Sequence, residues 1–286
     1  MKQIADRLVD ALRSAATVLP GDVVEALERA RSEEESGTAR SQLDAILENV
    51  RLAREKNVPI CQDTGMQTFF VTAGINSQHL RAVLSAIPKA VERSTKEIPL
   101  RPNTVSPFTG QNPGNNLGPH MPITKVEIVE GDEIRIDILP KGGGSENISQ
   151  LWMLTPSEGL KGARRRMLEH VRAAGGKPCP PVVLGIGIGG GADYAMHLGK
   201  KALLRPLGQR HPEPSVAALE LEILRDINAL GIGPMGLGGR TTALDLHIEY
   251  TYRHPATFPV GLVVQCWADR RASVIVSGKG EIEVLQ

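Results

Sequence analysis

Three cysteines lie far apart in this chain, so any role that they share would require the fold to bring three distant segments together. Cys61 lies within residues 59–65, which read PICQDTG. Cys179 lies within residues 178–181, which read PCPP, and Cys266 lies within residues 265–271, which read QCWADRR. Each cysteine is therefore surrounded by proline or polar residues typical of loops, where functional side chains are concentrated.

Two interpretations of the cysteines stay open on spacing alone. Scattered thiols are often small buried hydrophobes with no chemical role. Three thiolates can also hold a [4Fe–4S] cluster and leave one iron open, and an open iron can bind a substrate hydroxyl as a Lewis acid. The other motifs of the chain are needed to choose between these two interpretations of the cysteines.

Composition narrows the class of protein. A chain of 286 residues can form one large domain or two modest ones. A net charge of +1 and only 3% aromatic residues give no electrostatic or stacking signature for nucleic acid. No apolar run approaches the ~20 residues of a membrane span, and the N-terminus lacks an apolar signal core. Three cysteines argue against a disulfide framework, so we expect a cytoplasmic protein.

Two basic clusters stand among other charged residues. They are residues 164–166 and the pair Arg270 and Arg271. We interpret both as solvated faces or subunit contacts.

Hydrophobic periodicity predicts an α/β (mixed α+β) fold, in which N-terminal helices over about 1–57 precede interleaved strands and helices. Residues 123–129 and 133–139 alternate with period two around a Glu-Gly-Asp turn and are expected to form a hairpin. Residues 99–122 are rich in proline and glycine and are expected to form a functional loop. The other expected strands are 66–73, 182–188, 242–252, 260–265 and a final hairpin of 273–277 and 281–285; the other expected helices are 77–95, 156–174, 192–203 and 214–231.

Three short motifs could carry chemistry. Residues 61–65 place a thiol, an amide, a carboxylate and a hydroxyl in succession, although Asp-Thr-Gly is also a common turn. It also resembles half of an aspartic-protease dyad, but such a dyad needs a second motif or a homodimer of a mostly β chain, and neither fits this sequence. Residues 141–147, KGGGSEN, could form an anion-binding nest of backbone N–H groups or a flexible turn.

The third motif is residues 185–190, which match the G-x-G-x-x-G pattern of dinucleotide sites. The acidic strand end expected about 20 residues later is missing, because residues 205–214 contain three prolines. A nicotinamide-dependent oxidoreductase is therefore the less favoured alternative. His254 and Arg101 are further candidates that local sequence alone would not single out.

Taken together, these segments resemble the iron–sulfur (class I) fumarate hydratase family, in its α-subunit or N-terminal half. The matching words are PICQDTG at 59–65, RPN at 101–103, KGGGSEN at 141–147, PCPP at 178–181 and the block from His254 to Cys266. They follow one another from about residue 38 to 271. The sister family, L-tartrate dehydratase α subunits, shares the cysteines but tends to lack the GGGSEN form, which favours fumarase.

The resemblance implies a role for each matching residue. Cys61, Cys179 and Cys266 would ligate a [4Fe–4S] cluster with one open iron site. Gln62, Arg101 and the backbone N–H of Gly144 would bind the carboxylates of a dicarboxylate substrate. Asp63 and His254 would be the acid–base pair that serves the substrate hydroxyl.

The resemblance also implies a function and a partner. The whole chain, 1–286, would be the α subunit of a hydro-lyase that reversibly hydrates fumarate to L-malate, a step of the tricarboxylic acid cycle. In that family the base that removes the C3 proton lies in a C-terminal domain, so a separate β subunit would complete the enzyme in a larger hetero-oligomer. L-tartrate dehydratase and a non-catalytic iron–sulfur sensor are the alternatives that keep the cluster.

Overall fold

The computed structural model describes residues 2–286 and divides into two compact units. The first unit contains the N-terminal residues up to Gly21, Asn49–Gly143 and Arg270–Gln286. The second contains Asp22–Glu48 and Gly144–Asp269. Each is described by itself below. No helix within residues 2–286 is both long and apolar enough to cross a membrane.

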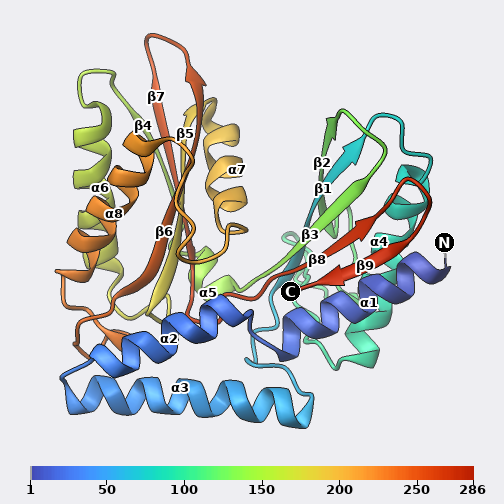
Figure 1. Ribbon diagram of the computed structural model, residues 1–286, viewed down its shortest axis with the longest axis horizontal. Coiled ribbons are helices and arrows are strands. Elements are labelled where there is room, and N and C mark those ends of the chain that lie inside the picture. Colours follow the sequence, from blue (N-terminus) through green and yellow to red (C-terminus); the bar gives the residue numbers. More distant parts are fainter. Residues whose placement is uncertain (1) are drawn as a thin grey trace. The chain divides into compact units, whose positions relative to one another are not determined.

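The first unit is a five-stranded mixed sheet with two helices, α1 (Lys2–Thr17) and α4 (Leu80–Glu97) (Figure 1). Both helices are amphipathic, and their apolar residues form one core cluster with the sheet. The strands, in spatial order, are β2 (Ile123–Val129), β1 (Met66–Gly74), β3 (Ile134–Lys141), β8 (Ala272–Val276) and β9 (Ile282–Leu285).

The expected hairpin of 123–129 and 133–139 is wrong. Both segments are strands, but β1 lies between them, parallel to β2 and antiparallel to β3. Residues 67–71 of β1 are all buried, whereas the last four residues of β2 are exposed. Burial therefore places the apolar β1 in the interior of the sheet and leaves β2 at its edge. The final hairpin of β8 and β9 is confirmed.

The second unit is a four-stranded sheet with helices on both faces (Figure 1). The strands run in the order β4 (Gln150–Leu154), β7 (Phe258–Gln265), β5 (Val182–Gly190) and β6 (Ala243–Arg253). Apolar side chains of α6 (Gly159–Ala174) and α8 (Pro214–Asn228) share a core with β5 and β7. Helix α7 (Ala192–Ala202) packs on β5 and β7 from the other face. The unit also holds α2 (Gly21–Glu33) and the first half of α3 (Gly37–Lys56).

Most elements expected from the sequence are present, so the mixed α/β class and the helical N-terminal segment are confirmed. Strand β4 was not anticipated, because it is short and follows the glycine run directly. That run forms the single turn α5 (Gly143–Glu146), and a 3₁₀ turn, η1 (Pro234–Gly236), lies in another glycine-rich segment.

The G-x-G pattern at 185–187 is explained by packing. Leu184 and Ile186 belong to the core shared with α6 and α8, so the alternating Gly185 and Gly187 face α7. A Cβ at Gly187 would lie 1.9 Å from the carbonyl oxygen of Ala195, and one at Gly185 would lie 2.0 Å from that of Gly199. The helix backbone thus occupies the space that a side chain would need, which removes the main support for a dinucleotide site.

A buried ionic network ties the segment after α7 to β6. Arg205 bonds Glu220 of α8 at 2.6 Å, and Arg210 bonds Asp245 of β6. Burial alone would raise the pKa of Asp245, but its contact with His247 and the bonds from Gly208 N and Arg210 lower that pKa to about 2. Arg205 also donates to Ile248 O at 2.8 Å and Arg210 to Leu246 O at 3.1 Å, so the network covers the backbone edge of β6.

We predict that Gly187→Ala destabilises the second unit by about 3 kcal/mol or more, because the methyl group must displace helix backbone. Gly37→Ala is the matched control, since no atom lies within 4 Å of its Cβ position. Urea unfolding followed by circular dichroism measures both. Equal midpoints for Gly187→Ala and the native chain would contradict the close contact.

Candidate functional site

Three of the predicted site residues line one hollow in the first unit. Cys61 and Gln62 lie in the loop that joins α3 to β1, and Arg101 lies near the start of the proline-rich stretch after α4. The hollow has a volume of about 330 Å³. It is lined by Pro59, Cys61, Gln62, Thr64, Pro99 and Arg101. Thr64 fastens the two segments together, because its hydroxyl accepts a hydrogen bond from Arg101 N at 3.0 Å.

The Asp63 carboxylate accepts hydrogen bonds from three segments: its own loop, the stretch after α4 and the glycine run after β3. Its Oδ1 accepts from Gly65 N at 3.0 Å and from Asn103 Nδ2 at 3.5 Å. Its Oδ2 accepts from Gly143 N at 2.8 Å. The sequence left an anion-binding nest and a flexible turn open for residues 141–147, and the amide of Gly143 in this motif binds the Asp63 carboxylate of the same chain. Asp63 is thereby fixed in one orientation, half-buried beside Cys61 and Gln62.

Asparagines organise the long stretch 99–122, in which the structure has no helix or strand. Asn116 is buried, and its side chain accepts from Asn103 N at 2.7 Å and donates to Arg101 O at 3.0 Å. Asn103 in turn donates to Gly65 O at 3.2 Å. Sequence reasoning quoted Asn103 but assigned it no role. The sequence does offer one signal for Asn103: an asparagine in a proline-rich loop often hydrogen-bonds nearby backbone through its side-chain amide.

Cys179 and Cys266 lie at the same end of the sheet in the second unit. Strand β5 begins three residues after Cys179, and β7 ends one residue before Cys266. The two strands are antiparallel, with Val183 paired to Gln265. A hydrogen bond of 3.2 Å from Trp267 N to Cys179 O then joins the two cysteine loops. The structure therefore brings these two predicted ligands together.

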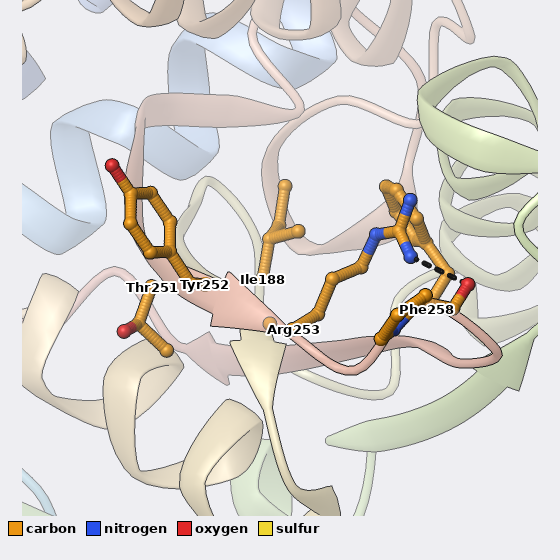
Figure 2. Close-up of a pocket in the computed structure, with 7 residues that line it drawn as sticks. Ile188, Thr251, Tyr252, Arg253 and Phe258 are labelled. Carbon is orange, nitrogen blue, oxygen red and sulfur yellow. Dashed lines mark hydrogen bonds between the residues drawn. The ribbon is translucent and has the colours of Figure 1, made fainter.

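His254 lies in the turn between β6 and β7, and the turn is held in shape by Arg253. Nη1 of Arg253 donates to the carbonyl oxygens of His254, Pro255 and Thr257, each at 3.1 Å. Its guanidinium lies 5.1 Å from the centre of the Phe258 ring (Figure 2). Ala256 N donates to Nδ1 of His254 at 3.1 Å, so the neutral imidazole carries its proton on Nε2.

This turn is at the opposite end of the sheet from the two cysteines, because β7 runs from the turn to Cys266. Eight strand residues at about 3.3 Å each separate them by roughly 25 Å. A second hollow, of about 430 Å³, lies beside the turn and is lined by Ile188, Gly189, Thr251, Tyr252, Arg253, Pro255 and Phe258 (Figure 2). His254 of one copy is therefore remote from Cys179 and Cys266 of that same copy.

The donor set fits an iron–sulfur cluster in its chemistry. No disulfide joins the three cysteines, and each is half-buried in a loop, where a thiolate can reach a metal. Thiolates are the ligands that iron–sulfur clusters prefer. Cys61 belongs to the first unit and the other two to the second. Within residues 2–286 the structure gathers no preformed group of three or more His, Cys, Asp or Glu ligands.

Comparison with known proteins gives the family. The fumarate hydratase (Fumerase) family matches residues 5–275 of this chain. A protein of Methanocaldococcus jannaschii, provisionally named L(+)-tartrate dehydratase subunit alpha, is 49% identical over 274 residues, which cover 94% of this chain and 96% of that protein.

Two further relatives come from Escherichia coli and carry the name L(+)-tartrate dehydratase subunit alpha. The protein from strain O157:H7 is 38% identical over 262 residues. The protein from strain K12 is 37% identical over the same length. Each alignment covers 91% of this chain and 86% of the relative.

Proposed function

Because the chain belongs to the fumarate hydratase (Fumerase) family, a hydro-lyase family, we propose that it is the α subunit of a two-subunit enzyme that removes water from a 2-hydroxy dicarboxylate. The observation that carries this proposal is the hollow lined by Cys61, Gln62 and Arg101, which lies beside the fixed carboxylate of Asp63. A thiolate, an amide, a guanidinium and a carboxylate suit the binding of a metal cofactor and an acidic substrate together.

Cys61, Cys179 and Cys266 would hold the [4Fe–4S] cluster. When bound, a cluster with three thiolate ligands supplies an open iron that makes a substrate hydroxyl a better leaving group. The shared position of Cys179 and Cys266 at one sheet end supports this assignment.

The side chains of the first unit would bind and orient the substrate. Arg101 offers two parallel N–H groups to a carboxylate, and Gln62 donates its amide N–H from the same hollow. The backbone N–H of Gly144, next to the Gly143 amide that binds Asp63, would donate to a carboxylate of the substrate. Asp63 would hold or accept the proton of the hydroxyl that leaves or enters. Its backbone hydrogen bonds keep Oδ1 and Oδ2 at fixed positions during that transfer.

The relatives named as α subunits support a partner subunit. We propose that a β subunit supplies the base that removes the proton from the neighbouring carbon. The names of the same relatives support L(+)-tartrate as the first substrate to test. The KGGGSEN form at 141–147 favours the second candidate, L-malate and fumarate, through the resemblance described above.

Assays of the anaerobically purified chain, with and without its β subunit, test this function. We expect water elimination from L(+)-tartrate or L-malate only when both subunits are present, with one substrate preferred by at least about tenfold in kcat/KM. Arg101→Met should raise KM for either acid, and the surface variant Arg135→Met should not. Full activity of the chain alone would contradict the need for a partner, and inactivity of the assembled pair on both acids would contradict the proposed reaction.

His254 can serve as part of the acid–base pair only if its side chain reaches a cluster site. Since roughly 25 Å separate the β6–β7 turn from Cys266, we propose that His254 acts at the site of a second copy of the chain. Nε2 carries the proton of the neutral ring and would donate it there.

Co-expression of two inactive variants tests this arrangement. Asp63→Asn and His254→Asn should each be nearly inactive alone. Random pairing of the two should recover about a quarter of native activity, because one of the two sites in each mixed pair has both residues intact. Mixed Asp63→Asn and Asp63→Ala chains are the control, and they should recover nothing. No recovery in the first mixture, or full activity of His254→Asn, would contradict the shared site.

A further inference from the structure

Arg270 is the buried cation that the sequence interpretation missed. The sequence placed it, with Arg271, on a solvated face or in a subunit contact, but its exposed fraction is only 1%. Within the described residues, its Nε and Nη1 atoms are buried and have no hydrogen-bond partner. A buried guanidinium without compensation is strongly unfavourable, so its presence calls for a nearby negative group.

A negative group lies across Gly142 in the same unit. The Cβ position that Gly142 lacks is 3.8 Å from Nη2 of Arg270 and 3.2 Å from Oδ2 of Asp63. The guanidinium and the carboxylate therefore both approach the space that a side chain at position 142 would fill. That glycine adjoins Gly143, whose N–H donates to the same Oδ2 of Asp63.

Lys141 is a second buried basic residue beside the glycine run at 142–144. It is 1% exposed, and its Nζ donates to the carbonyl oxygen of Gly142 at 3.3 Å. Lys141 ends β3, and its register partner is Met66, which begins β1 just after the Asp63 loop. Lys141 thus contacts the glycine loop, and Arg270 lies beside it, at the point where the loop binds Asp63.

We propose that Arg270 is a positioning residue for the proposed hydro-lyase reaction, which holds the Asp63 carboxylate against the amides of Gly65 and Gly143. The inference rests on the proposed role of Asp63 but concerns its placement. The positive charge attracts the carboxylate into the glycine loop, where little water competes with the attraction. Lys141 keeps the loop itself in place through the Gly142 carbonyl. Gly142 is required because any side chain there would separate the two groups.

The crystal structure of the full chain carrying Arg270→Met provides the direct test. We expect Asp63 to leave at least one of its two backbone amides, at Gly65 N and Gly143 N. Retention of both hydrogen bonds at their native lengths would overturn the proposal. This readout does not depend on the cluster, the β subunit or the identity of the substrate.

Kinetics of the assembled enzyme provide the second readout. Arg270→Met should lower kcat by about 10- to 100-fold, since small misplacements of a reacting group cost this much, while KM stays within about threefold. Iron content should be unchanged, and Arg270→Lys should recover part of the loss. The surface variant Arg135→Met is the matched control, because its charge lies on the exposed side of the same sheet.

A double variant separates positioning from a general structural effect. If Arg270 acts through Asp63, then Arg270→Met should cost nothing further in an Asp63→Asn background. An additive loss, or a loss of iron in Arg270→Met, would contradict the proposal. An inactive native enzyme would contradict the proposed function, whereas the crystallographic result would still decide the placement of Asp63.

Gly142→Ala tests the same geometry if Arg270→Met fails to fold. The added methyl group would lie 3.2 Å from Oδ2 of Asp63, which is closer than ordinary contact. We expect the carboxylate to shift and kcat to fall with all buried charges retained. Native kcat and an unmoved Asp63 in this variant would overturn the proposal.

Discussion

The antiparallel pairing of β5 with β7 is the constraint on which the second unit depends. It places the start of one strand beside the end of the other, and so joins the loops of Cys179 and Cys266. Gly185, Gly187 and Gly261 let α7 approach the paired strands to backbone contact. The same register sends the β6–β7 turn to the far end, with His254 in it. The β5–β7 pairing thus places Cys179 near Cys266 and keeps His254 away from both.

Asp63 plays the corresponding part in the first unit. Its carboxylate joins the loop before β1 to the glycine run after β3, and the side chain of Asn103 adds the proline-rich stretch. Three segments that are distant in sequence are therefore held by one side chain. Buried Arg270 and Lys141 lie under this junction. A carboxylate so constrained has little freedom to reorient, which suits a group that must meet a substrate atom at a fixed position.

Local pattern predicted the elements, and tertiary packing decided their neighbours. The amphipathic stripes of α1 and α4 and the final β8–β9 hairpin could be predicted, because each depends on residues close in sequence. The expected pairing of 123–129 with 133–139 was wrong, since the buried β1 competes for the same edge. Gly185 and Gly187 gave a dinucleotide-like pattern because close helix packing and phosphate binding both require glycine.

The candidate site shows the same division. Motif resemblance singled out Cys61, Gln62 and Arg101, and the structure places all three on one hollow. The burial of Arg270 could not be predicted, because its neighbour Arg271 and the adjacent Asp269 make the segment look like a charged surface. The remoteness of His254 from Cys266 was also hidden, because the eleven residues between them could fold back until β7 is known to be extended.

We propose that Cys61, Cys179 and Cys266 together hold an iron–sulfur cluster. Anaerobic reconstitution with iron and sulfide, followed by the 400 nm absorbance and the iron count per chain, tests it most directly. We expect about four irons per chain, as a [4Fe–4S] cluster requires, and a sharp fall in each single Cys→Ser variant. A folded chain that binds no iron, or one whose iron survives the loss of any of the three thiols, would contradict the claim.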